Sequence, residues 1–125
     1  MSEKLKTHKA LDAWKRSMDL VGTIYKDTKA FSGEELYRLI NQLRRVVVFV
    51  PSNIAEGAAR SSQKEFIQFL HTALGSVSEV ERQLAIAKRL GYLDNLNSIE
   101  EQIQTVRKLI LGLIPYLRRE DGNER

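Results

Sequence analysis

Apolar residues recur at alternating steps of three and four along most of this chain, and polar residues fill the positions between them. That spacing places the apolar side chains in a stripe along one face of an α-helix. Four such stripes predict four helices, at about residues 8–29, 33–59, 63–90 and 95–118. Because the connections are short, consecutive helices should run antiparallel, so we predict an all-α chain, an antiparallel up-down-up-down four-helix bundle.

The same stripes predict the core of the bundle. The expected core residues are, helix by helix, Leu11, Trp14, Met18, Val21 and Tyr25; Leu36, Ile40, Leu43, Val47, Val50 and Ile54; Phe66, Leu70, Ala73, Val77, Val80, Leu84 and Ala87; and Leu96, Ile99, Ile103, Val106, Ile110, Leu113 and Leu117. Beyond these stripes the second and fourth helices carry further apolar residues: Leu39, Val46, Val48, Phe49, Leu109, Leu111 and Ile114. This is more apolar surface than one bundle can bury, which favours self-association.

The segment Val46–Val50 is a strand candidate by composition, because β-branched and aromatic residues favour a pleated sheet. Two observations favour a helix instead: the helical spacing passes through the segment without a break, and no second strand is available to pair with it. Pro51 follows inside the predicted helix, where it removes a backbone donor. We therefore predict a kink or a local break at Pro51.

Residues suited to helix ends punctuate the four stripes. Ser32–Glu35 has the spacing of a capping box at the start of the second helix, and Ser62 with Glu65 has the same spacing at the start of the third. Gly91 suits a left-handed C-cap after the third helix. The candidates for the cap of the fourth helix are Asp94, Asn95 and Ser98.

The composition of the chain fits one domain, residues 1–125, with residues 1–7 and 119–125 expected to be loose tails. It contains no cysteine, so no disulfide and no thiolate zinc site is expected, and we predict a cytoplasmic location. The N-terminus lacks the apolar run of a signal peptide, and no apolar stretch is long enough to span a membrane. The net charge of +4 and the pI near 9.5 favour an anionic partner.

A track of polar residues runs beside the apolar stripes of the second and third helices. If these helices meet through a turn near residue 61, facing residue numbers should sum to roughly 124, which predicts a contact between Arg45 and Glu79. Such a track either specifies the register of the helices or recognises a ligand or partner. Its members are Arg45, Asn53, Glu56, Arg60 and Glu79.

Catalytic chemistry is not evident from the sequence. The two histidines, His8 and His71, have no obvious catalytic companions, and Gln68 stands where a di-iron bundle needs a glutamate before His71. No phosphate-binding glycine loop and no nucleophile elbow occurs. We therefore predict no catalytic, metal or cofactor site, and no enzymatic activity.

Basic residues form adjacent pairs at 44–45, 88–89 and 118–119, and the N-terminus is basic as well. Clustered lysine and arginine side chains are sufficient for sequence-independent binding of phosphates. The candidate nucleic-acid contacts are Arg44, Lys88, Arg89, Arg118 and Arg119.

From Ala13 to Leu93 the chain resembles a bacterial family of four-helix-bundle proteins encoded in intervening sequences of 23S rRNA genes. The motifs that carry the resemblance are Leu11-Asp12-Ala13-Trp14, Glu35-Leu36-Tyr37-Arg38-Leu39, Gln42-Leu43-Arg44-Arg45, Pro51-Ser52-Asn53-Ile54-Ala55-Glu56-Gly57 and Ala73-Leu74-Gly75-Ser76-Val77-Ser78-Glu79. The chain departs from the family pattern at Arg38, Val46 and Phe49, where smaller residues are usual.

The resemblance implies a homopentamer without catalytic activity that binds RNA or DNA. A related bundle, the accessory variability protein of retroelements, forms a pentamer and partners a reverse transcriptase. Our leading hypothesis is therefore a non-enzymatic homo-oligomeric scaffold that binds nucleic acid. The alternative is a protein-binding adaptor, for example an accessory subunit of a reverse transcriptase.

Overall fold

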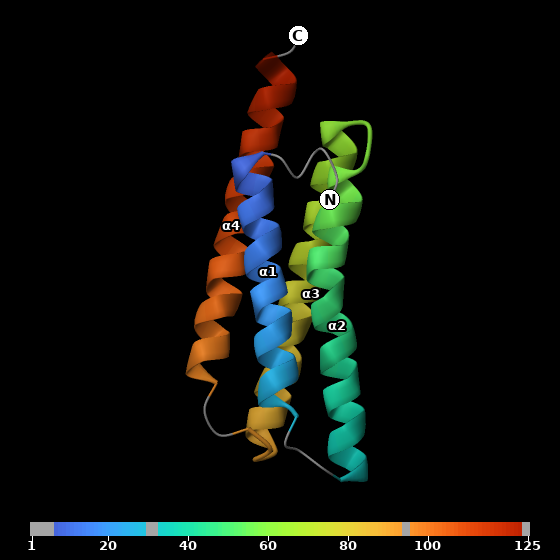
Figure 1. The fold of residues 1–125 in the computed structure, drawn as a ribbon, viewed down its shortest axis with the longest axis vertical. Helices are drawn as coiled ribbons and strands as arrows, with labels where there is room; N and C mark the ends of the chain where they lie inside the picture. Colours follow the sequence, from blue (N-terminus) through green and yellow to red (C-terminus); the bar gives the residue numbers. More distant parts are fainter. Residues whose placement is uncertain (1–6, 30–32, 94–95, 124–125) are drawn as a thin grey trace.

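The computed structural model describes residues 7–29, 33–93 and 96–123. They form four helices, α1 (His8–Asp27), α2 (Glu34–Ala58), α3 (Gln63–Arg89) and α4 (Asn97–Asn123), which run alternately down and up in one bundle (Figure 1). Each helix packs against two neighbours: α1 and α3 each contact both α2 and α4. The predicted all-α four-helix bundle is confirmed, and residues 46–50 are helical.

The core follows the predicted stripes in three of the helices. All seven stripe residues of α3 and all seven of α4 are buried, as are five of the six in α2, where Leu36 is half-buried. These side chains form one contiguous apolar cluster along the bundle axis. Burial of this apolar area is the main force that holds the four helices together.

The predicted stripe of α1 is wrong by one position. Its buried residues are Ala10, Ala13, Ser17, Leu20 and Ile24, which have the same helical spacing as the predicted set. The predicted residues lie about 100° further round the helix. Three of them, Leu11, Trp14 and Val21, are half-buried, whereas Met18 and Tyr25 are exposed.

Two predicted helix ends are confirmed. The Ser62 hydroxyl accepts a hydrogen bond from the backbone N–H of Glu65 at 3.1 Å, which caps α3. Gly91 has a φ of +80° after the last turn of α3. The N–H groups of Gly91 and Tyr92 donate to the carbonyls of Lys88 and Ala87, which is the hydrogen-bond pattern of a Schellman motif.

Other predicted ends differ from the structure or lie outside it. Ser32 is outside the described residues, and the N-cap of α2 is Gly33, with a φ of +119° and no side-chain cap. Asp94 and Asn95 are also outside, while Ser98 lies within α4 and not before it. α4 continues past the predicted end at residue 118 as far as Asn123.

α2 continues through Pro51, whose side chain is buried. Proline lacks the N–H that would bond the carbonyl of Val47. The predicted local break is absent, because α2 is one continuous helix. Val50 and Ile54, on either side of the proline, are fully buried in the same core. Tertiary packing therefore outweighs the lost hydrogen bond.

None of the helices in the described ranges is long and apolar enough to cross a membrane.

Candidate nucleic-acid interface

The five predicted phosphate contacts do not come together in one place. Lys88 and Arg89 lie in the last turn of α3, whereas Arg118 and Arg119 lie near the end of α4, which runs in the opposite direction. The two pairs are therefore at opposite ends of the bundle (Figure 1). All four side chains are exposed, and Lys88 and Arg89 have no hydrogen bond or ion pair with the side chains that the structure describes. Each pair is accessible to a phosphate.

Arg44 has a different environment from the other four. Its Nε donates to the Thr28 hydroxyl at 3.0 Å, and its Nη2 donates to the carbonyl oxygen of Tyr25 at 3.0 Å. The guanidinium also lies 4.7 Å from the centre of the Tyr25 ring. Arg44 thus holds the C-terminal end of α1 against α2, and two of its three side-chain nitrogens already have partners.

A groove runs between the C-terminal half of α3 and the N-terminal half of α4, with a volume of about 1110 Å³. Its basic lining comes from Lys88 and Arg89 on α3 and from Lys108 on α4, and its acidic lining comes from Glu81 on α3 and from Glu100 and Glu101 on α4. Lys108 is exposed and, within the described ranges, has no hydrogen bond or ion pair. Sequence reasoning missed Lys108, although the adjacent pair Arg107–Lys108 is the same signal that identified the other basic residues.

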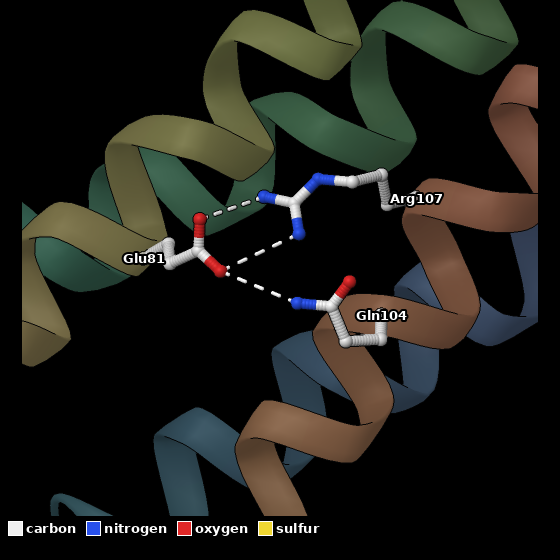
Figure 2. Close-up of polar contacts among 3 residues, drawn as sticks. All are labelled: Glu81, Gln104 and Arg107. Atoms are coloured by element: carbon white, nitrogen blue, oxygen red, sulfur yellow. Dashed lines mark hydrogen bonds and ion pairs between the residues drawn. The ribbon is translucent and has the colours of Figure 1, made fainter.

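Glu81 of α3 points across this groove toward Arg107 and Gln104 of α4 (Figure 2). Its carboxylate accepts hydrogen bonds from Arg107 Nη2 at 2.9 Å and Nη1 at 3.4 Å, and from Gln104 Nε2 at 3.4 Å. The Arg107 side chain is mostly buried in this contact. Arg107 is thereby neutralised, so the free positive charge of the groove lies at Lys88, Arg89 and Lys108.

The predicted contact between Arg45 and Glu79 is wrong. Glu79 forms an ion pair with Arg82 and accepts a hydrogen bond from Gln83 Nε2 at 3.1 Å, both on its own helix. Arg45 is exposed and has no such partner in the described residues. A partner three or four positions away on the same helix is already aligned, so it wins over one on a neighbouring helix.

The remaining members of the polar track also make local contacts. Arg60 pairs with Glu56 at 2.7 Å and lies 4.8 Å from the ring centre of Phe69 on α3. Asn53 donates to the carbonyl of Phe49 at 2.7 Å. These contacts do not converge on one cavity, and only the Arg60–Phe69 contact reaches a different element, from the turn after α2 to α3.

The environment of Glu79 lowers the pKa of its carboxyl below the ordinary value, first through the hydrogen bond from Gln83 and then through that from Arg82. Because the folded-state pKa is lowered, ionised Glu79 stabilises the fold above its ordinary pKa. This contribution is lost as the pH falls through the folded-state pKa.

Replacing Gln83 with methionine is expected to raise the free energy of unfolding by less than about 1 kcal/mol, because relief of the buried Gln83 Oε1, which has no hydrogen-bond partner, outweighs the loss of the hydrogen bond to the partly exposed Glu79. The substitution should also raise the pKa of Glu79 toward its ordinary value. Urea unfolding and NMR titration of the carboxyl measure the two effects. The control is Gln102→Met, since Gln102 bonds both Thr23 and Ser98; this variant should be less stable. A destabilised Gln83→Met variant would contradict the prediction.

Large apolar side chains remain exposed on two sides of the bundle. On the first side Met18 and Tyr25 of α1 are 44% and 42% exposed, beside Val48 of α2 at 37%. Val48 lies one turn from Arg44, which contacts Tyr25, so these residues share the α1–α2 side. We call Trp14, Met18, Val21, Tyr25 and Val48 the outer apolar face. Sequence reasoning assigned most of it to the core.

The second exposed apolar side lies between α3 and α4. Leu111 is 50% exposed and lies one turn beyond Arg107, on the side of α4 that contacts α3. Leu74 of α3 is half-buried and lies two turns before Glu81. Exposed apolar side chains are therefore present on α2 and α4, as expected, at Val48, Phe49 and Leu111. α1 also exposes apolar side chains, at Met18 and Tyr25.

A family model described as 23S rRNA-intervening sequence protein matches residues 9–112 of the chain. The matched range begins in α1, covers α2 and α3 entirely and ends inside α4. The chain belongs to this family. A search of curated proteins finds no match.

Membership in the 23S rRNA-intervening sequence protein family confirms the resemblance seen in the sequence and associates the chain with that intervening sequence. The matched range contains Arg44, Lys88, Arg89 and Lys108, together with the whole polar track. Arg118 and Arg119 lie beyond it. The groove at the α3–α4 side is thus built from residues inside the family match. The relation to retroelement proteins stays a prediction.

Proposed function

We propose that this protein is a non-enzymatic, homo-oligomeric scaffold that binds nucleic acid, in keeping with its family, through exposed basic side chains. The observation that carries the proposal is the group of exposed side chains Lys88, Arg89 and Lys108 around one groove, which form no ion pair in the described residues although Glu81, Glu100 and Glu101 also line the groove. Lysine and arginine side chains that have no partner within the protein release the counterions of a nucleic acid when they bind its phosphates. Arg118 and Arg119 supply a second exposed pair.

Self-association is supported by the two exposed apolar sides. They lie on different pairs of helices, so one copy can place its outer apolar face against the α3–α4 side of the next. Such a head-to-tail contact forms a ring when the rotation between neighbouring copies closes, and five is the number of subunits that the family resemblance implies. A ring repeats the same basic groove in every subunit, and binding several phosphates at once multiplies a weak single contact.

Nucleic-acid binding is tested by fluorescence anisotropy with a labelled RNA at increasing salt. The wild-type affinity should fall steeply with salt. The double variant Lys88→Gln/Arg89→Gln should bind more weakly, with a slope of log affinity against log salt that is smaller by about 1.5 to 2. The control Lys15→Gln/Lys26→Gln removes the same charge from exposed positions of α1 and should keep most of the affinity. No binding by the wild-type protein at low salt would overturn the proposal.

Assembly is tested by sedimentation equilibrium. The wild-type mass should be a multiple of the 14.3 kDa chain mass, with five the favoured multiple. Met18→Lys places a charge in the outer apolar face and should lower the mass, because a charge is costly to bury in an interface. Leu90→Lys adds the same charge at an exposed position outside that face and should leave the mass unchanged. A monomeric wild-type protein at micromolar concentration would remove the ring from the proposal.

A further inference from the structure

One face of α2 carries basic and aromatic side chains together. Arg38, Gln42, Arg45 and Phe49 follow one another at steps of four, three and four, so they line up along the helix over about 16 Å. All four are exposed, and the Phe49 ring is 46% exposed. We call them the α2 stripe. It lies away from the core residues Leu43, Val47 and Val50.

The positive charge of Arg45 is not neutralised by the side chains that the structure describes. Arg45 has no hydrogen bond or ion pair with them, in contrast to Arg44, which is bound to α1, and Arg60, which is paired with Glu56. The stripe itself contains no acidic residue. On the adjacent helix α3, the carboxylate of Glu79 is already held by Arg82 and Gln83.

Phe49 is the feature that distinguishes this stripe from the groove between α3 and α4. The groove has basic side chains but no aromatic residue in its lining, so it offers no ring on which a base could stack. The α2 stripe adds an exposed ring one turn from an arginine. In a duplex the faces of the bases are stacked on one another, whereas in a single strand they are free to stack on an aromatic side chain.

We propose that the α2 stripe binds single-stranded nucleic acid, with the Phe49 ring stacked on a base and Arg38 and Arg45 in contact with neighbouring phosphates. This inference rests on the proposed nucleic-acid-binding function and specifies its ligand as unpaired strand. Phe49 lies about 100° round the helix from Val48 of the outer apolar face, so the two side chains point in different directions.

The test measures fluorescence anisotropy with a labelled uridine RNA of about 20 nucleotides, longer than typical site sizes of ~4–16 nucleotides, and with its duplex. Phe49→Leu keeps an apolar side chain but removes the ring. It should lower affinity for the single strand by roughly 5- to 100-fold, as expected for the loss of one base–aromatic stack, and leave duplex affinity unchanged. Arg45→Gln should reduce the slope of log affinity against log salt by about 0.7. Tyr37→Leu removes another exposed ring of α2 outside the stripe and should have no effect.

The outcomes separate this inference from the proposed function. If the wild-type protein binds neither the single strand nor the duplex at low salt, both the inference and the proposed function are wrong. If it binds but Phe49→Leu weakens the two forms equally or not at all, the stripe is not a single-strand site and the proposed function stands. A lower oligomer mass for Phe49→Leu in sedimentation equilibrium would place the ring in a subunit contact and overturn the inference.

Discussion

Replacing Gly57 with alanine is expected to lower the free energy of unfolding by about 2 kcal/mol. A Cβ atom at Gly57 would lie 2.6 Å from the Cβ of Phe69 and 3.2 Å from the backbone oxygen of Phe66. Neither atom is the end of a flexible side chain, so α2 and α3 would have to move apart near their turn. This cost exceeds the ~1 kcal/mol that alanine gains over glycine inside a helix.

The control for this prediction is Gly112→Ala in α4. Gly112 is exposed, and a Cβ there would meet no atom within 4 Å, so only the helix propensity changes. This variant should be more stable than the wild type by about 0.5–1 kcal/mol. Urea unfolding followed by circular dichroism measures both changes at one protein concentration, because association shifts apparent stability. A Gly57→Ala variant as stable as Gly112→Ala would show that the two helices do not approach closely.

Arg44→Met is expected to lower the free energy of unfolding by about 1–2 kcal/mol. The substitution removes the hydrogen bonds to the Thr28 hydroxyl and the Tyr25 carbonyl, together with the contact to the Tyr25 ring. The last carbonyl groups of a helix have no partners within the helix, so a cation that bonds one of them stabilises that end. Methionine retains the apolar stem, which isolates the loss of the guanidinium.

The neighbouring residue Arg45 provides the matched control for Arg44. It is exposed and has no partner among the described residues, so Arg45→Met should change the stability by less than about 0.5 kcal/mol. The two variants lose the same charge and are compared by thermal unfolding. Equal stabilities would mean that the contacts of Arg44 contribute nothing to the free energy of unfolding. Arg44 would then again be a candidate phosphate contact.

The helices and most of the core were predictable because α3 and α4 each carry one dominant apolar stripe. In α1 two stripes with the same period lie one residue apart. The stripe with the larger side chains, led by Trp14 and Met18, is the outer one, while the core side uses the small residues Ala10, Ala13 and Ser17. Periodicity alone cannot tell which of two such stripes is buried in the core. Side-chain size favours the stripe that is in fact on the outside.

The candidate interface was less predictable than the fold. Adjacent basic residues mark exposed charge correctly at Lys88–Arg89 and Arg118–Arg119, but the dipeptide Arg44–Arg45 contains one residue packed against α1 and one free residue. Successive residues of a helix point about 100° apart, so a pair in the sequence is rarely a pair in space. The groove required the placement of Lys108 of α4 along the same groove as Lys88 of α3, which depends on the tertiary fold.

The side-by-side packing of α1 and α4 joins segments from the two ends of the chain and has a consequence for the order of folding. Thr23 and Gln102, which bond each other across these helices, are 79 residues apart, whereas α2 and α3 are separated only by a tight turn. Closing the longer loop costs roughly 4 kcal/mol of chain entropy before any contact compensates for it. We therefore expect helices that are neighbours in the sequence to pair first, and the contact between α1 and α4 to form last and to open first.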